Sequence, residues 1–171
     1  MHSRRRKWFV AGTIFILFAV AAGVIWRVTA HRDTNIAFEE ADVKVDISWE
    51  NPTAQQMILK VRYTPVESGF HLYSKDMPLD GIDGLGRPTR LEIVDGFTAD
   101  GVVSADKQAV DLRLQGLDTS FPVYPEGSVT LRLPIKASAG SGTIRVGYMA
   151  CSLTRCMPPH EKTIDLLSPA P

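Results

Sequence analysis

About eight short segments of the chain alternate apolar with polar residues, the pattern of β-strands that bury one face. In the clearest of them Val43, Val45 and Ile47 alternate with polar residues. Clusters of Gly, Pro, Asn, Asp and Ser separate the segments, and no helical period of useful length follows residue 32. The other expected strands are 58–63, 70–73, 90–94, 110–114, 129–133, 143–148 and 163–166.

Strands of this number and spacing predict an all-β domain, an immunoglobulin-like antiparallel β-sandwich over residues 41–167. A small barrel is the alternative. The longest irregular stretch, 74–88, is rich in Gly, Asp and Pro, and loops of that length in compact domains are often functional. Residues 168–171 are expected to form a short tail.

The amino-terminal part has a different character, because the 19 residues between Lys7 and Arg27 carry no charge. A helix of that length, rising about 1.5 Å per residue, spans roughly the hydrocarbon thickness of a bilayer. Trp8 and Trp26 occupy its two ends, where indoles favour the interface, and the basic run before it keeps the amino terminus cytoplasmic. The expected segments are a basic tail at 1–7, a transmembrane signal-anchor helix at 8–28 and a linker at 29–40.

This pattern predicts a single-pass membrane protein whose carboxy-terminal domain is exported. The alternative is a signal peptide cleaved after Val28-Thr29-Ala30, which would leave a soluble exported domain. We favour the uncleaved anchor, because the apolar run is long and Trp26-Arg27 suits a cleavage site poorly.

The overall charge is zero, with 19 basic and 19 acidic residues, but the charges are unevenly distributed. Residues 1–32 hold six basic and no acidic residues, which leaves 13 basic against 19 acidic and a net charge of −6 after them. A nucleic-acid binder is excluded, since it needs a basic surplus. The ordinary apolar fraction, 44%, argues against disorder.

Most sequence motifs of enzymes are absent: there is no P-loop, no GxSxG, no HExxH and no GxGxxG. What remains is the pair Cys151 and Cys156, with four residues between them. Exported thiols meet an oxidising compartment, so a disulfide is expected, although closing so short a loop contributes only roughly 2 kcal/mol. Two cysteines are too few for a disulfide-rich scaffold.

Two features favour an exchangeable bond. Alternation from Ile144 to Ala150 turns Cys151 away from the core side, toward solvent or a covering loop. Arg155, beside Cys156, would favour a thiolate there. The residues alone leave a structural and a redox-active disulfide open.

The segment 147–159 resembles a motif of a known family. Its Tyr148-x-x-Cys151 and Cys156-x-Pro158-Pro159 are similar to the cysteine motif of the amino-terminal periplasmic domain of the thiol:disulfide interchange protein DsbD. The segments 69–74, 86–92, 133–135 and 139–140 resemble other parts of that domain, in the expected order. The resemblance covers roughly residues 41–167, and the spacing of four matches only shorter homologues.

The resemblance implies a redox-active pair in an immunoglobulin-like sandwich, working by thiol–disulfide exchange without a cofactor. Cys151 and Cys156 would form the pair, and Cys156 would join the mixed disulfide with a partner. A cap loop shields the pair in that family, for which Phe121, with Tyr124 close behind, is the candidate; Asp118 is the nearest match to the family's acidic residues.

The resemblance also implies that the membrane is the bacterial inner membrane and that the exported domain lies in the periplasm, or is soluble there if the peptide is cleaved. The implied partners are thioredoxin-like redox proteins of the periplasm, such as disulfide isomerases and cytochrome c maturation proteins. The family's multi-helix membrane domain and thioredoxin-like domain have no counterpart in these residues, so a separate membrane electron-transfer protein is the expected donor.

Two other functions compete with this one. The first is an envelope binding module with a structural disulfide. The second is a Cu(I) site, because soft sulfur ligands and imidazole lie within twelve residues. Its ligands would be Met149, Cys151, Cys156, Met157 and His160.

Overall fold

The structure is a computed structural model that describes residues 35–50, 56–114, 116, 118–136 and 140–169. Over these ranges the chain forms antiparallel strand pairs and no helix, which confirms the all-β class. None of the described residues therefore belongs to a helix able to cross a bilayer. The predicted tail and anchor at 1–28, and the linker as far as residue 34, lie outside the described residues.

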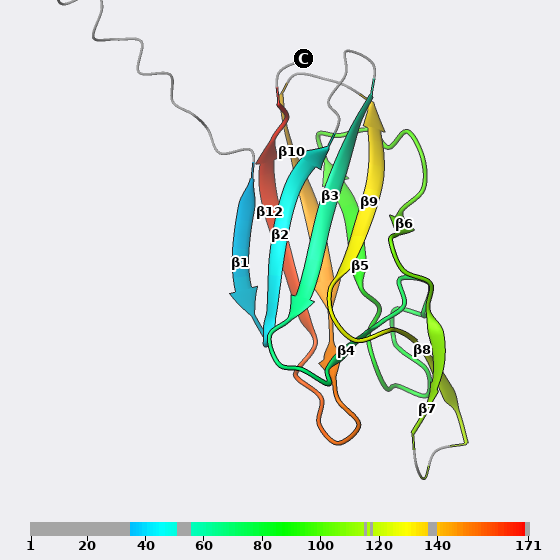
Figure 1. Ribbon diagram of the computed structural model, residues 1–171. Helices are drawn as coiled ribbons and strands as arrows, with labels where there is room; N and C mark the ends of the chain where they lie inside the picture. The colour runs from blue at the N-terminus through cyan, green and yellow to red at the C-terminus, as the bar shows by residue number, and fades with distance from the viewer. Residues whose placement is uncertain (1–34, 51–55, 115, 117, 137–139, 170–171) are drawn as a thin grey trace, which may run out of the picture. The chain divides into compact units, whose positions relative to one another are not determined.

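The strands, drawn in Figure 1, form three sheets. Their bounds are β1 Ile36–Glu40, β2 Val43–Glu50, β3 Gln56–Pro65, β4 His71–Tyr73, β5 Arg90–Asp95, β6 Ser104–Ala105, β7 Val110–Arg113, β8 Ser120–Tyr124, β9 Val129–Lys136, β10 Ser141–Tyr148, β11 Ala150–Cys151 and β12 His160–Leu167. The first sheet has the order β1-β2-β3-β9-β6, the second β12-β10-β5 and the third β11-β4-β8-β7. All eight segments predicted from alternation lie wholly or largely within strands.

The first two sheets pack face to face, so the domain is a β-sandwich rather than a barrel, with β2, β3 and β9 in front of β12, β10 and β5 in Figure 1. Alternate residues of each strand point inward: Val45 and Val61 from one sheet meet Ile144 from the other, and all three are fully buried. Each such side chain stabilises the fold by about 1.5–3 kcal/mol. We call this buried set between the two sheets the main core.

Two tyrosines join the sheets inside the main core. The rings of Tyr63 on β3 and Tyr148 on β10 meet edge to face with their centroids 5.7 Å apart. Tyr63 donates its hydroxyl proton to the carbonyl of Arg90, and Tyr148 donates to the carbonyl of Glu40 at 2.9 Å. Buried phenols need such partners, and these bonds also fix the end of β10 from which the chain runs on to the cysteines.

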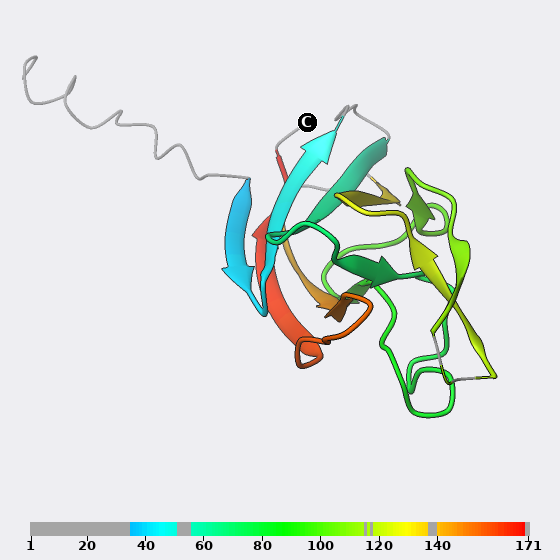
Figure 2. The ribbon, with the colours of Figure 1, turned by 60° about the horizontal axis from the view of Figure 1, so that its bottom comes forward.

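The third sheet lies at one end of the sandwich. Figures 1 and 2 both show the loop after β10 at the same end as β4 and the β7–β8 hairpin. The sheet is short, since β4 has three residues and β11 has two, and β11 pairs with β4 through Ala150↔Leu72 and Cys151↔His71. This small sheet is the framework on which the cysteines are held.

One segment differs from the sequence expectation. Ile36–Glu40, assigned to the linker, forms strand β1, which pairs with β2 along its whole length. The turn between them consists of Ala41 and Asp42, both with positive φ (48° and 57°), as a two-residue hairpin turn requires. Neither residue is glycine, so the turn was not recognisable from the sequence, and the half-buried strand reads as polar.

Candidate functional site

The chain reaches the cysteines by leaving the second sheet for the third. Along β10 and β11 the side chains of Ile144, Val146, Tyr148 and Ala150 are all buried in the main core. Cys151 points to the opposite face, where it is 1% exposed. The expectation that Cys151 turns away from the core toward a covering segment is therefore confirmed.

A tight turn brings the two cysteines together. The N–H of Ser152 donates to the carbonyl of Arg155 at 2.7 Å, and the N–H of Met157 donates to the carbonyl of Ala150 at 2.9 Å. These bonds place Cys151 and Cys156 opposite each other, with their Cα atoms 4.0 Å apart, and the two form a disulfide. A spacing of four residues is thus the length of a hairpin turn that closes on the pair.

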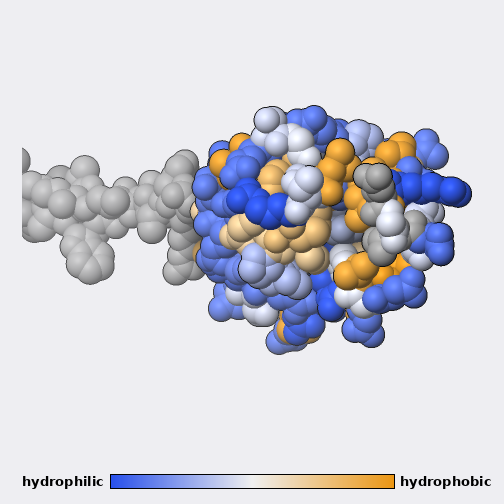
Figure 3. Space-filling view, turned by 90° about the horizontal axis from the view of Figure 1, so that it is seen from below, coloured by the Kyte–Doolittle hydropathy of each residue, from blue (hydrophilic) through white to orange (hydrophobic). Residues whose placement is uncertain are grey.

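The two ends of the disulfide meet different surroundings. Cys156 is exposed, whereas Cys151 lies among buried side chains from β4, β8 and the loop after β4. Figure 3 views this end from below and shows hydrophobic side chains scattered among hydrophilic ones. Leu153, inside the cysteine loop, is 72% exposed. We call the buried set the sulfur cluster; it consists of Tyr73, Met77, Phe121, Val123 and Cys151.

Tyr73 makes the polar contact of the sulfur cluster. Its hydroxyl donates to Sγ of Cys151 at 3.2 Å, and burial raises the pKa of this phenol, so it remains a donor at neutral pH. Thr89 donates both its N–H and its hydroxyl to the carbonyl of Tyr73 and holds that strand end. A Cβ on Gly86, at φ +75°, would lie 2.9 Å from the Tyr73 ring, so only glycine lets the loop approach so closely.

His71 is a site residue that sequence reasoning did not select, since it assigned the histidine to the surface or the core. It lies directly opposite Cys151 across the β4–β11 pair and is 8% exposed. Its ring meets that of Tyr73 edge to face at 5.6 Å, and its buried Nε2 has no hydrogen-bond partner among the described residues. Burial lowers the pKa of His71, so the imidazole is neutral at pH 7.

The two aromatic residues named from the sequence as a cap occupy different places, both on strand β8 rather than in a loop. Phe121 belongs to the sulfur cluster and packs edge to face on Tyr73 at 6.1 Å. Tyr124 belongs to the main core, and its hydroxyl accepts the N–H of Lys75 at 3.0 Å. Asp118 is exposed in the segment between β7 and β8.

Arg155 ties the cysteine loop to the rest of the domain. Its guanidinium forms an ion pair with Glu67 at 2.8 Å and lies over the ring of Phe70, 5.1 Å from the centroid. The sequence predicted that its charge favours a Cys156 thiolate. The ion pair with the Glu67 carboxylate offsets the charge of Arg155, which reduces its stabilisation of a Cys156 thiolate.

The five residues named as Cu(I) ligands are divided between different surroundings. Met149 packs against the sulfur cluster, Met157 packs against the main core, and Nε2 of His160 lies 2.7 Å from a carboxylate oxygen of Glu40. Within the described part of the chain, no group of three or more His, Cys, Asp and Glu residues is arranged to hold a metal ion.

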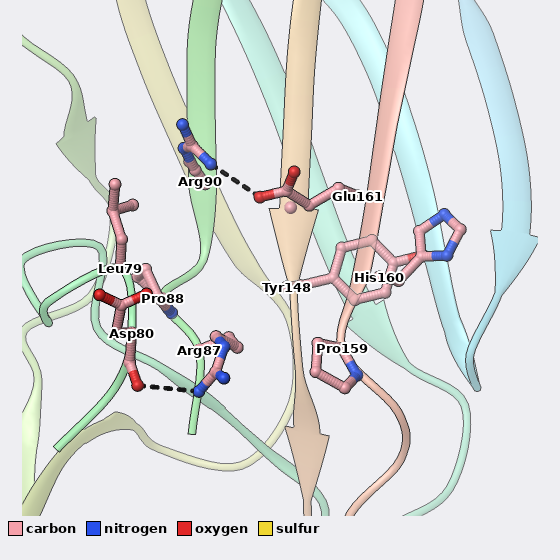
Figure 4. Close-up of a pocket in the computed structure, with 10 residues that line it drawn as sticks. Leu79, Asp80, Arg87, Pro88, Arg90, Tyr148, Pro159, His160 and Glu161 are labelled. Carbon is pink, nitrogen blue, oxygen red and sulfur yellow. Dashed lines mark hydrogen bonds and ion pairs between the residues drawn. The ribbon is translucent and has the colours of Figure 1, made fainter. Parts of the chain in front are cut away.

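Beside the site lies a cleft of about 360 Å³ between β10, β12 and the loop before β5 (Figure 4). Both of its arginines already have partners. Arg90 pairs with Glu161 at 2.7 Å and Arg87 donates to the carbonyl of Asp80 at 3.0 Å. The disulfide, rather than this cleft, is therefore the group of this region able to react.

Comparison with known proteins finds likeness in structure rather than in sequence. No protein-family model matches the chain, and no curated protein matches it. The N-terminal periplasmic domain of ScsB from Proteus mirabilis matches with a TM-score of 0.55 at 10% identity, over 80% of this chain and 52% of that one. The chain therefore spans about half the length of that structure.

Two further solved structures match less well. The N-terminal domain of DsbD from Neisseria meningitidis, in the reduced form, has a TM-score of 0.41 at 18% identity, over 64% of this chain and 76% of that one. The GAE domain of GGA2p from Saccharomyces cerevisiae has a TM-score of 0.41 at 11% identity, over 79% and 96%. The likeness to the ScsB periplasmic domain is thus one of fold, and the chemistry has to be argued from the site.

Proposed function

We propose that the domain, an immunoglobulin-like sandwich, is a thiol–disulfide exchange module that relays electrons through Cys151 and Cys156 to or from thioredoxin-like partners. The observation that carries the proposal is the asymmetry of the disulfide. Cys156 is exposed to an incoming protein, whereas Cys151 is 1% exposed and accepts a hydrogen bond from Tyr73. A disulfide with one accessible sulfur and one supported leaving group suits a directed exchange.

In the reducing direction, the thiolate of a partner attacks Sγ of Cys156 and the Cys151–Cys156 bond breaks. Cys151 leaves as a thiolate, to which the Tyr73 hydroxyl already donates. The second thiol of the partner then attacks the partner's sulfur in the mixed disulfide. This step releases the domain with both cysteines reduced. The two electrons come from the partner dithiol, which becomes a disulfide, and no cofactor takes part.

The covering segments account for the selectivity of such a relay. Phe121 and Met77 pack around Cys151, so small thiols meet only the Cys156 end. The bond from Lys75 N–H to the Tyr124 hydroxyl anchors the start of the loop that carries Met77. Phe121 is thus proposed as the cap itself and Tyr124 as an anchor of the cap.

We also propose that the module works in the periplasm, held to the inner membrane by residues 8–28, with a separate membrane protein as electron donor. The basic run before a long apolar segment supports this topology. Protease added to intact spheroplasts should then degrade an epitope placed after Pro171, and a protected epitope would contradict the topology. A carboxy-terminal domain released without detergent would support the cleaved form instead.

The exchange itself is tested by a matched pair of single-cysteine variants of the full chain. Cys151→Ala retains the exposed Cys156 and should capture a thioredoxin-like protein as a mixed disulfide, whereas Cys156→Ala should not, because its thiol is buried. The disulfide of the wild-type chain should have a reduction potential above about −300 mV.

Other results would favour the competing functions. A potential below about −300 mV, with no capture by either variant, would indicate a structural disulfide in a binding module. Stoichiometric Cu(I) binding by the reduced chain, lost in Cys156→Ser, would indicate the metal site.

A further inference from the structure

The proposed relay leaves one chemical problem unsolved. When the reduced domain donates electrons, Cys156 joins the partner in a mixed disulfide and Cys151 must then attack Sγ of Cys156. Only a thiolate attacks, yet Cys151 lies 1% exposed among Tyr73, Met77 and Phe121. An apolar environment disfavours the charged form, so a buried thiol gives up its proton poorly without a nearby base.

The structure places a base next to this thiol. His71 and Cys151 are directly opposite in the β4–β11 register, and paired residues of antiparallel strands project to the same face with their Cβ atoms about 5 Å apart. Tyr73 links the two, because its ring packs on that of His71 and its hydroxyl contacts Sγ of Cys151. The face of this small sheet therefore presents an imidazole, a phenol and the sulfur together.

His71 also has the capacity to accept a proton. It is more than nine-tenths buried, and its Nε2 has no hydrogen-bond partner among the described residues. Leaving a buried polar nitrogen without a partner destabilises the folded state, which a purely structural residue would avoid. Burial keeps the imidazole neutral at pH 7, the form that accepts a proton.

We infer that His71 is the base that takes the proton of Cys151 in the resolving step, an inference that rests on the proposed function. The S–H bond of Cys151 breaks and its proton passes to the imidazole. The thiolate attacks Sγ of Cys156, the Cys151–Cys156 bond forms, and the bond from Cys156 to the partner breaks. The partner leaves as a thiolate with the electron pair of that bond, and the imidazolium releases its proton to solvent.

Tyr73 has the complementary task. Burial raises the pKa of its phenol, so it donates a hydrogen bond and does not accept the proton. The other titratable or charged groups on the segments around His71 are mostly exposed and in pairs or bonds of their own. They are the Arg155–Glu67 ion pair, the Lys75–Asp76 ion pair and Glu126, which accepts the N–H of Gly69.

The test uses 5,5′-dithiobis(2-nitrobenzoate) as a disulfide partner whose product is coloured. Attack by Cys156 releases the first thionitrobenzoate, and attack by Cys151 on the resulting mixed disulfide releases the second, so stopped-flow absorbance separates the two steps. In the wild type the rate of the second step should rise with pH and level off before pH 7 is reached. In His71→Gln it should be at least about tenfold slower at pH 7 and should rise steadily with pH beyond 8.

The controls separate a chemical from a structural role. The first step and the urea midpoint of His71→Gln should match the wild type, while Tyr73→Phe should slow the second step without moving its pH profile. If the wild-type second step rises steadily with pH and shows no plateau near neutrality, His71 is not the base, whatever the variant does. Failure of the relay would appear differently, as a wild-type chain that releases no second thionitrobenzoate.

Discussion

The main core and the sulfur cluster are both buried, but they are built differently. The main core joins two sheets through aliphatic side chains such as Val61 and Ile144, and Tyr63 and Tyr148 find carbonyl partners. The sulfur cluster is small, lies under short strands, and holds a disulfide sulfur beside the phenol of Tyr73. The imidazole of His71 packs on that phenol, and its Nε2 has no hydrogen-bond partner within the described part of the chain. The first region supplies most of the buried aliphatic side chains, and the second holds the groups on which the proposed exchange depends.

The largest effect that would separate the two regions is a cavity in the main core. Leu131→Ala removes a fully buried side chain of β9 and should lower the free energy of unfolding by about 2–5 kcal/mol, measured by urea titration. Because Leu131 does not contact the sulfur cluster, the reduction potential of the folded protein should stay unchanged. A shifted potential would show that the two regions are coupled.

A smaller change in the sulfur cluster should have the reverse effect, with little loss of stability and a clear change in the reaction of the disulfide. Phe121→Leu keeps an apolar side chain but loosens the packing on Tyr73, and should cost only about 1 kcal/mol of stability. Glutathione should reduce the disulfide several-fold faster, since Cys151 and its surroundings become more accessible. Phe97→Leu, the same change in the main core, is the matched control, and an equal acceleration there would refute the capping role of Phe121.

The smallest effect concerns β1, the edge strand of the first sheet. A side-chain hydrogen bond from Lys162, and then the charges of Lys162 and His160, hold the pKa of Glu40 below its ordinary value of 4.5. A carboxylate whose pKa is lowered in the folded state stabilises it above the ordinary pKa, and that contribution is lost as the pH falls through the folded-state pKa. As the pH drops below about 4.5, the stability of Glu40→Gln should therefore fall less steeply than that of the wild type.

Thermal unfolding measured from pH 7 to pH 3 checks this prediction, with Glu39→Gln on the exposed face of the same strand as its control. The exchange kinetics should not change in either variant. If the melting temperature of Glu40→Gln falls as steeply at acid pH as that of the wild type, the ion pairs of Glu40 with Lys162 and His160 contribute nothing to stability.

The sequence predicted the repetitive parts of the fold well, because alternation follows directly from burying one face of a sheet. The strands β2, β3, β9, β10 and β12 were all expected. Strand β8 was not, since Pro122 lies at its centre and its buried residues Phe121 and Tyr124 serve two different clusters. A strand whose buried residues face two clusters shows no simple alternation of apolar and polar residues.

The site was predictable only in part. The cysteine motif and the direction in which Cys151 points are local, so the sequence shows them. The hydrogen bond from Tyr73 to Cys151 joins residues 78 positions apart, and the opposition of His71 to Cys151 depends on the register of β4 with β11. Register between distant strands is set by the whole fold and leaves no mark in a single sequence.

The turn that holds the cysteines has a consequence for how often the bond can open and close. Its backbone hydrogen bonds, from Ser152 N–H and Met157 N–H, involve no sulfur, so cleaving the disulfide does not remove them. The two thiols then face each other at a high effective concentration, and closing the ring again costs little chain entropy. In the proposed relay, each cycle would therefore start from a preformed geometry, and no part of the domain would have to refold.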